Sequence, residues 1–244
     1  MVTSFESDGA KLRVGFLAEG EERRALDDAV AEVLGKLEEN PPIEMFGKVV
    51  RQRRHVAFFA DPNDTYGYFY SGSVAKSKPL GDGIRFLMQL VNAKFEAQFN
   101  GVLVNYYPDG SHYISDHSDS ESGLDPHAGV VIVSVGAART MHFKRAKNAS
   151  EGACSFEKQG SHKVTLSHAS VVAMQGPKFQ KCYTHGIPKE EKTAPGPRWS
   201  FTFRRHTKEG EAKKIAAAEK TLARIAAKLA AEEEEPAAKR AKTA

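Results

Sequence analysis

The segment Pro197-Arg198-Trp199-Ser200-Phe201-Thr202-Phe203-Arg204 alternates polar and aromatic side chains from Arg198 to Arg204. Alternate side chains of a strand point to opposite faces of a sheet, so three aromatic rings share one face and Arg198, Ser200, Thr202 and Arg204 share the other. If the aromatic face packs on outer helices, both guanidinium groups point into a barrel, where an unpaired arginine is costly. An anionic ligand in that interior would pair with them. An exposed edge strand with its polar face in water explains the pattern equally well.

The region before this segment has the texture of a β-rich domain. Short runs of Val, Ile, Tyr, Phe and Thr are separated by Gly, Pro, Asp and Ser, and about eight such strands predict a closed or double-sheet antiparallel architecture such as a jelly roll. The expected strands are Val102–Tyr107, Tyr113–Ser115, Val130–Val135, Thr140–Lys144, Lys163–Leu166, Ser170–Met174, Lys181–Thr184 and Trp199–Arg204.

Two amphipathic helices are expected ahead of the strands, over Glu21–Leu37 and Asp82–Phe99, because their apolar residues recur at helical spacing. The fold class that follows is α+β: a double-stranded β-helix (jelly-roll) core, with an N-terminal helical and mixed extension packed on it.

Length and composition fit one sizeable domain or two small ones, since the 244 residues are 41% hydrophobic and 27% charged. A net charge of +4 permits a nucleic-acid partner without demanding one. Cys154 and Cys182 fit no repeated metal spacing, and without a secretory segment we expect reduced thiols in an intracellular protein. No apolar run reaches the roughly 18–20 residues that span a bilayer, so no membrane partner is expected. We expect a monomer.

A metal site is indicated by His117-Ser118-Asp119, which places an imidazole and a carboxylate two residues apart in a strand-forming stretch. Both side chains can then converge on one point, and His185 lies at the end of a later strand. Two histidines and one carboxylate leave coordination positions open, as in non-haem iron(II) oxygenases. A dicarboxylate such as 2-oxoglutarate could chelate that iron and pair with the arginines. A lone His-x-Asp is more often a polar surface loop.

Five stretches together resemble the AlkB family of nucleic-acid dealkylases, and they follow the family order over about Phe46 to His206. They are Asn105-Tyr-Tyr-Pro-Asp-Gly, His117-Ser-Asp-Ser-Glu121, Val133-Ser-Val-Gly-Ala-Ala-Arg139, Tyr183-Thr-His-Gly-Ile-Pro188 and Arg198-Trp-Ser-Phe-Thr-Phe-Arg204. The duplex-DNA repair branch is the most similar, because Met45-Phe46-Gly47-Lys48 resembles its wedge motif.

The resemblance implies that the two histidines and the aspartate bind iron(II). It implies that 2-oxoglutarate is held at its distal carboxylate by Arg198 and Tyr107, and at its metal-chelating end by Arg204 and Asn105. The family has Asn where this chain has Ser200, whose hydroxyl still offers a hydrogen bond there.

The activity that the resemblance implies is an Fe(II)/2-oxoglutarate-dependent dioxygenase acting in DNA repair. It would demethylate 1-methyladenine and 3-methylcytosine in double- or single-stranded DNA, consuming O2 and releasing formaldehyde, succinate and CO2. These lesions block the pairing edge and ease extrusion of the base. The alternatives are an RNA demethylase or protein oxygenase on the same core, and a catalytically inactive nucleic-acid-binding module.

Several residues are expected to contact the substrate. By family position two tyrosines line the base pocket, an acidic residue meets the exocyclic amino group, and a phenylalanine wedge is followed by cations suited to phosphate contact. The alternative for the tyrosines and the phenylalanine is that they pack in the core. The alternative for the acidic and basic residues is that they are solvated at the surface without a partner. The set is Tyr68, Tyr70, Glu121, Phe46, Lys48, Arg51 and Arg53, with Arg54 in the same basic stretch.

The expected organisation has four parts: 1–40, an N-terminal segment with an amphipathic helix; 41–100, a nucleotide-recognition region and helix; 101–206, the jelly-roll dioxygenase core; and 207–244, a charged, largely disordered tail. The tail ends in Pro236–Lys242, which resembles a nuclear-localisation signal, so we expect action in the nucleus. We expect its deletion to leave catalysis intact. Lys189-Glu190-Glu191-Lys192 replaces the basic triplet of duplex-acting relatives, which leaves single-stranded DNA or RNA open as substrates.

Overall fold

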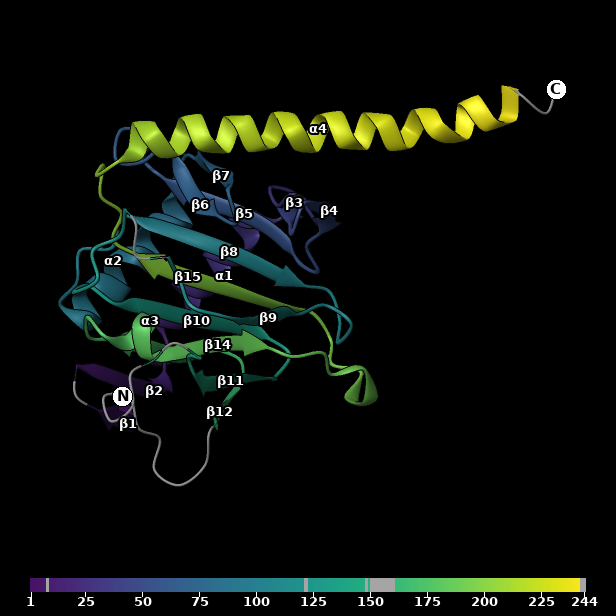
Figure 1. Ribbon diagram of the computed structural model, residues 1–244. Helices are drawn as coiled ribbons and strands as arrows, with labels where there is room; N and C mark the ends of the chain where they lie inside the picture. Colours follow the sequence, from purple (N-terminus) through teal and green to yellow (C-terminus); the bar gives the residue numbers. More distant parts are fainter. Residues whose placement is uncertain (8, 121–122, 148, 150–160, 242–244) are drawn as a thin grey trace.

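The computed structural model describes residues 1–7, 9–120, 123–147, 149 and 161–241, and two sheets dominate it (Figure 1). The major sheet has nine strands in the order β1-β2-β13-β10-β15-β8-β5-β7-β6. These strands are β1 (Val2–Ser7), β2 (Ala10–Phe16), β13 (Ser170–Gln175), β10 (Val130–Gly136), β15 (Arg198–Arg204), β8 (Gly101–Tyr107), β5 (His55–Ala60), β7 (Ser73–Lys78) and β6 (Gly67–Tyr70).

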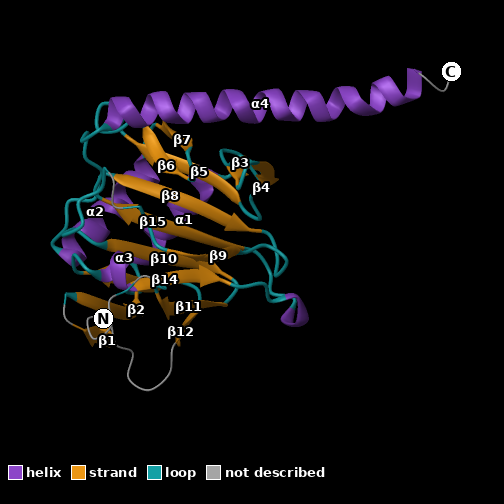
Figure 2. Cartoon of the chain, in the orientation of Figure 1, coloured by secondary structure: helices purple, strands orange, loops and turns teal. Residues whose placement is uncertain are grey.

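A minor sheet and a separate hairpin complete the β structure (Figure 2). The minor sheet has the order β12-β11-β14-β9, and its strands are β12 (Ser161–Leu166), β11 (Arg139–Arg145), β14 (Tyr183–Ile187) and β9 (Ile114–His117). The hairpin pairs β3 (Pro42–Met45) with β4 (Lys48–Arg51). The two facing sheets confirm the predicted α+β jelly roll.

Helices α1 (Glu21–Val33) and α2 (Asp82–Phe95) cover the outer face of the major sheet. Both end earlier than their apolar pattern predicts. Beyond α1 the chain reaches Gly35 with a φ of 73°, and α2 ends at Glu96 in a left-handed conformation with a φ of 51°. Phe99 still packs into the same core, which explains why it matched the helical pattern.

Strand β15 lies in the middle of the major sheet, between β10 and β8. Phe201 and Phe203 are fully buried against the layer that contains α1 and α2, whereas Arg198 and Arg204 are buried on the opposite face. The predicted division of aromatic and polar side chains between the two faces is therefore confirmed, and the alternative of an exposed edge strand is wrong.

The N-terminal part contains more β structure than its sequence predicts, because β1 to β7 all precede α2. The strand expected at Lys181–Thr184 begins later, since a one-turn helix, α3 (Phe179–Cys182), occupies its start, and a short 3-10 helix, η1 (Glu191–Thr193), precedes β15.

Cys182 is disulfide-bonded, so the expectation of a reduced thiol is wrong for this residue, and Cys154 lies outside the described residues.

The C-terminal helix α4 (Glu211–Ala241) lies across the β6–β7 end of the major sheet and projects beyond it (Figure 1). Ala218, Thr221 and Ile225 form its buried face. A solvated helix was expected only to about residue 231, followed by disorder, and the structure instead has one continuous helix. None of the described helices has the length and apolar character needed to cross a membrane.

Candidate active site

The two histidines and the aspartate predicted as metal ligands converge between the two sheets. His117 ends β9, His185 lies opposite it on β14, and Asp119 follows β9 by two residues. Nε2 of His117 lies 3.7 Å from Oδ1 of Asp119, and Nε2 of His185 lies 3.9 Å from the same oxygen. All three candidate ligand atoms lie within 4.8 Å of one another. The spacing suits one small cation, with other coordination positions left open.

Both imidazoles direct a ring nitrogen at the metal position. Nδ1–H of His117 donates to the backbone carbonyl of Ser115 at 2.9 Å, which leaves Nε2 directed at the site. Burial, together with the nearby charges of His117 and Arg204, lowers the pKa of His185 to about 3. His185 is therefore neutral at physiological pH.

Asp119 is oriented by the groups around it. Its backbone N–H donates to Oε1 of Gln180, and its Oδ2 accepts hydrogen bonds from Nε and Nη2 of Arg204 at 3.0 and 2.6 Å. Burial raises the pKa of Asp119, but Arg204 and the two imidazoles outweigh burial and hold that pKa well below its usual range. The buried Oδ1 has no hydrogen-bond partner in the described structure, so an ionised oxygen faces the metal position.

A second group of buried polar atoms lies at the other end of β15. Arg198 donates from Nη2 to Oγ of Ser134 at 2.8 Å, and its guanidinium lies 5.3 Å from the centre of the Tyr107 ring. Its Nε and Nη1 are buried without a partner in the described structure. Burial lowers the pKa of Arg198 to about 10, so the group stays charged at neutral pH. A buried cation with unused donors fits a carboxylate ligand.

The remaining predicted cosubstrate residues face the same interior. Asn105 lies on β8 opposite Ser200 on β15, and both are buried. The side-chain carbonyl of Asn105 accepts a hydrogen bond from Nε of Arg54 at 2.9 Å. Nη1 of Arg204 is buried without a partner, as is Oδ1 of Asp119. The chain therefore offers ligand atoms for a cation and unused cationic donors for a diacid, and this donor set fits iron(II) and 2-oxoglutarate.

A cavity of about 950 Å³ opens from the metal position to the surface. Its walls include His117 and Asp119, the β3–β4 hairpin, and the rings of Tyr68 and Tyr70. These two rings stack with their centres 5.8 Å apart and an interplanar angle of 22°. Gln52 donates to the Tyr70 hydroxyl at 2.8 Å, and burial raises the pKa of Tyr68 to about 12. The expected shared face of the two tyrosines is present, beside the metal position.

Phe46 forms the tip of the hairpin, where it is fully exposed. Phe46 and Gly47 have φ values of 50° and 75°, and they form a two-residue turn between the paired residues Met45 and Lys48. Phenylalanine rarely adopts a positive φ. Because its side chain is fully exposed, the alternative that Phe46 is a core residue is wrong.

The basic residues divide between the hairpin and the interior. Lys48 and Arg51 are exposed on β4, and both Arg51 and Arg53 line the cavity. Arg54 lines the same cavity and also donates to the side chain of Asn105. Glu121, the expected contact of the exocyclic amino group, lies outside the described residues.

Several residues that shape the site were not predicted from the sequence. Arg139 is buried and donates to the backbone carbonyls of Asp109, His112 and Pro188, which ties together the loops that follow β8 and β14. Gln180 and Ser134 hold Asp119 and Arg198, and Arg54 holds Asn105. Their roles depend on contacts between distant segments, for which the sequence carries no local signal.

Two histidines and one carboxylate beside buried guanidinium groups, inside a jelly roll, define a non-haem iron oxygenase of the class that uses a 2-oxo acid. The chain belongs to the 2OG-Fe(II) oxygenase superfamily, whose family model matches residues 9–204.

Its curated relatives are AlkB-like. The chain is 30% identical over 163 residues to the DNA oxidative demethylase ALKBH2 of Homo sapiens, a match that covers 67% of this chain and 60% of the relative. It is 28% identical over 181 residues to the protein of the same name from Arabidopsis thaliana, covering 67% of this chain and 56% of the relative. The chain thus spans between half and two thirds of these relatives.

A solved structure described as that of OsALKBH1 superposes with a TM-score of 0.51 at 17% identity, covering 84% of this chain and 100% of that one. At this identity the likeness supports the fold alone.

Proposed function

We propose that the protein is an Fe(II)- and 2-oxoglutarate-dependent dioxygenase that removes methyl groups from 1-methyladenine and 3-methylcytosine in DNA. One observation carries the proposal. A single cavity joins the His117, Asp119 and His185 site to a stacked pair of tyrosines and to a basic hairpin with an exposed phenylalanine. A metal site without that neighbourhood would support only a general oxygenase.

The roles of the interior residues follow from their positions. His117, Asp119 and His185 would hold iron(II), while Arg198 with Tyr107 would bind the distal carboxylate of 2-oxoglutarate. Arg204, Asn105 and Ser200 would position its other end. When bound, iron(II) and 2-oxoglutarate supply the oxidation with O2 that releases formaldehyde, succinate and CO2. Arg204 has a second role, because its bond to Oδ2 of Asp119 fixes which carboxylate oxygen faces the metal.

The cavity wall suits an extruded base. Tyr68 and Tyr70 offer aromatic surface for stacking, and His117 is the metal ligand most exposed to the cavity. Phe46 would fill the gap that the base leaves in the duplex, since apolar side chains can insert between base steps. Lys48, Arg51 and Arg53, beside it, would contact phosphates. Glu121 remains the expected contact of the amino group.

Two further observations favour DNA. Curated relatives bear the name DNA oxidative demethylase, and the mixed charge after β14 is less of an obstacle than its sequence suggests. Glu190 turns inward, where its carboxylate accepts a hydrogen bond from the backbone N–H of Thr140 and lies 3.7 Å from Arg139. We also propose action in the nucleus, which the basic segment Pro236–Lys242 and a DNA substrate support.

The test is to incubate the protein with iron(II), ascorbate and 2-oxoglutarate, and with methylated duplex DNA, single-stranded DNA or RNA, and to follow succinate and formaldehyde. We expect formaldehyde release from DNA that requires 2-oxoglutarate and is lost in His117→Ala. His127→Ala, an exposed histidine outside the site, is the matched control and keeps activity.

Each other outcome points to a different function. Formaldehyde from RNA alone would make the protein an RNA demethylase. Succinate without loss of methyl groups from any nucleic acid would favour a protein oxygenase, and absence of iron binding would favour an inactive nucleic-acid-binding module.

A further inference from the structure

Helix α4 makes a cluster of polar contacts with the hairpin that presents Phe46. Nε and Nη2 of Arg224 both donate to Oε2 of Glu44 on β3, at 3.0 and 2.8 Å. Lys228, one helical turn further on, bonds to the other oxygen of Glu44 and also donates to the backbone carbonyl of Gly47 at 2.7 Å. One helix face therefore holds both a strand of the hairpin and its turn.

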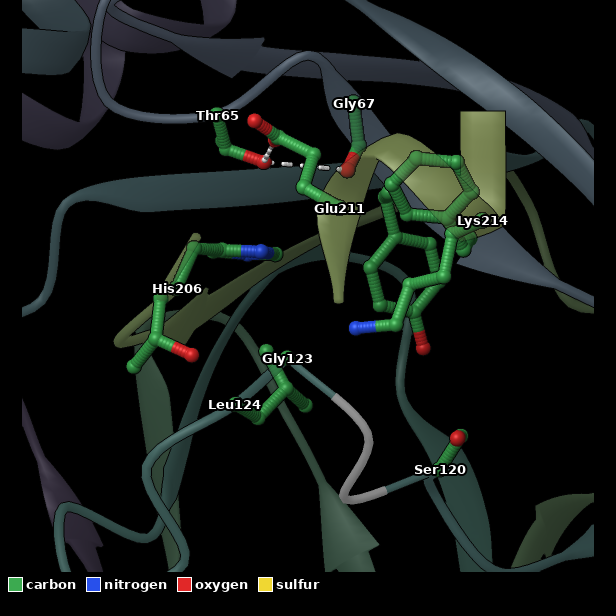
Figure 3. A pocket seen from close by; sticks show the side chains of 11 residues that line it. Thr65, Gly67, Ser120, Gly123, Leu124, His206, Glu211 and Lys214 are labelled. Atoms are coloured by element: carbon green, nitrogen blue, oxygen red, sulfur yellow. Dashed lines mark hydrogen bonds between the residues drawn. The ribbon is translucent and has the colours of Figure 1, made fainter. Parts of the chain in front are cut away.

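The helix itself is fixed to the body of the protein. Ala218, Thr221 and Ile225 bury one side of it near β7. At its first turn, Oε1 of Glu211 accepts a hydrogen bond from the Thr65 hydroxyl at 3.1 Å (Figure 3). The same oxygen accepts a hydrogen bond from the backbone N–H of Tyr66 at 2.7 Å. Since α4 is anchored at its start and along its side, its contacts with the hairpin fix the hairpin relative to the major sheet.

Apart from α4, the hairpin is held at its base, where Ile43 is buried and Gln52, the residue after β4, donates to the Tyr70 hydroxyl. Its two strands form a sheet of their own that pairs with neither larger sheet. Isolated two-stranded hairpins are marginally stable in water, and Met45 and Val50 keep 42% and 39% of their surface exposed. The contacts at Ile43 and Gln52 hold the base of the hairpin, whereas Lys228 of α4 holds its turn.

We propose that α4 is a positioning element for recognition of duplex DNA: through Arg224 and Lys228 it holds Glu44 and the turn at Gly47, and so fixes Phe46 relative to the cavity. This inference rests on the proposed function, because the hairpin matters only if a base is taken from a duplex. A methylated base in a single strand needs no wedge. Loss of the contacts should therefore slow reaction on duplex DNA and spare reaction on single-stranded DNA.

The test uses charge reversal on the full chain. Arg224→Glu combined with Lys228→Glu places two carboxylates against Glu44 and repels the hairpin. Adding Glu44→Lys to that double variant restores attraction with the signs exchanged. The matched control is Lys213→Glu with Lys220→Glu, which changes the net charge of α4 equally at two exposed positions.

Two measurements separate the outcomes. In the protein alone, hydrogen exchange of the amides in 42–51 should accelerate in the Arg224/Lys228 double variant, and the control should stay near wild type. The triple variant should lie between them, because it regains the contact with residue 44 but not the Lys228 bond to the Gly47 carbonyl. On methylated substrates, kcat/KM for duplex DNA should fall by about tenfold or more, because a small displacement of a remote positioning group can cost that much. The value for single-stranded DNA should be unchanged, and the triple variant should recover part of the activity on duplex DNA.

Unchanged hydrogen exchange over 42–51 in the double variant would overturn the proposal. Equal losses of kcat/KM on duplex and single-stranded DNA would also overturn it, because α4 would then have a role in stability alone. The exchange measurement needs no substrate. If the wild-type protein is inactive on all nucleic acids, the proposed function is refuted. Hydrogen exchange would still show whether Arg224 and Lys228 hold the hairpin.

Discussion

Replacing Arg198 by methionine should weaken binding of 2-oxoglutarate without weakening the fold. The side chain is buried, yet two of its three nitrogens have no partner in the described structure. A buried charge without its counter-ion is a cost that an apolar side chain of similar length removes. In the absence of 2-oxoglutarate, Arg198→Met should therefore melt at the wild-type temperature or above it.

The effect on the cosubstrate can be sized. Truncating one partner of a buried, hydrogen-bonded charge pair costs about 2–5 kcal/mol, and each 1.4 kcal/mol is tenfold, so the Kd for 2-oxoglutarate should rise by about 30-fold to several thousand-fold. A ligand at 100 times its Kd stabilises the folded state by about 2.7 kcal/mol, whereas at its Kd it stabilises by about 0.4 kcal/mol. The variant should thus lose most of the ligand-induced rise in Tm.

The measurements are thermal unfolding with and without 2-oxoglutarate and succinate formation over a range of cosubstrate concentrations. Arg139→Met is the matched control, because Arg139 is also buried but donates to three backbone carbonyls. Leaving those acceptors unpaired should cost at least about 3 kcal/mol, since a buried unsatisfied group costs about 1–3 kcal/mol.

Two results would refute this reasoning. One is an Arg198→Met protein whose Tm responds to 2-oxoglutarate as wild type does. The other is an Arg198→Met protein that, without ligand, loses as much stability as Arg139→Met. That result would mean that Arg198 stabilises the fold and does not bind a ligand.

Three more predictions concern other parts of the site. His117→Ala or Asp119→Ala should abolish turnover and weaken iron(II) binding measured by calorimetry, and retained activity would exclude the ligand set. Phe46→Ala should reduce kcat/KM on duplex DNA but spare single-stranded DNA, and equal activity on both would exclude a wedge. Burial lowers the pKa of His206 to about 3 from 6.5, so the unfolded chain binds the extra proton between these values and stability falls as pH drops through that window. Urea unfolding from pH 7 to pH 4 should show a shallower loss in His206→Gln, and identical slopes would contradict the buried neutral histidine.

Strand β15 and the metal ligands could be predicted because their signals are local. Alternation over Arg198–Arg204 reports two faces directly, and His117 and Asp119 are two residues apart. Strand β1 was missed for the opposite reason. It is an edge strand with much of both faces exposed, so the chain has no need of apolar residues at alternate positions.

The contacts that tune the site join distant segments and left no pattern to detect. Arg53 and Arg54 are neighbours in one basic run and both line the cavity, yet Arg54 also bonds to Asn105 on β8. Glu44 and Arg224 are 180 residues apart. A tail rich in Ala, Lys and Glu predicts a solvated helix, and only the folded arrangement shows which of its cations meet the hairpin.

The turn at Phe46 has a consequence for how this protein changes over generations. Asn-Gly is the preferred pair for a two-residue turn with positive φ at both positions, and a phenylalanine there carries about 1–2 kcal/mol of backbone strain. Drift governed by folding alone would replace it with asparagine or glycine. Its retention would then require selection for a task performed at the tip, and a search for thermostable variants would tend to discard that residue first.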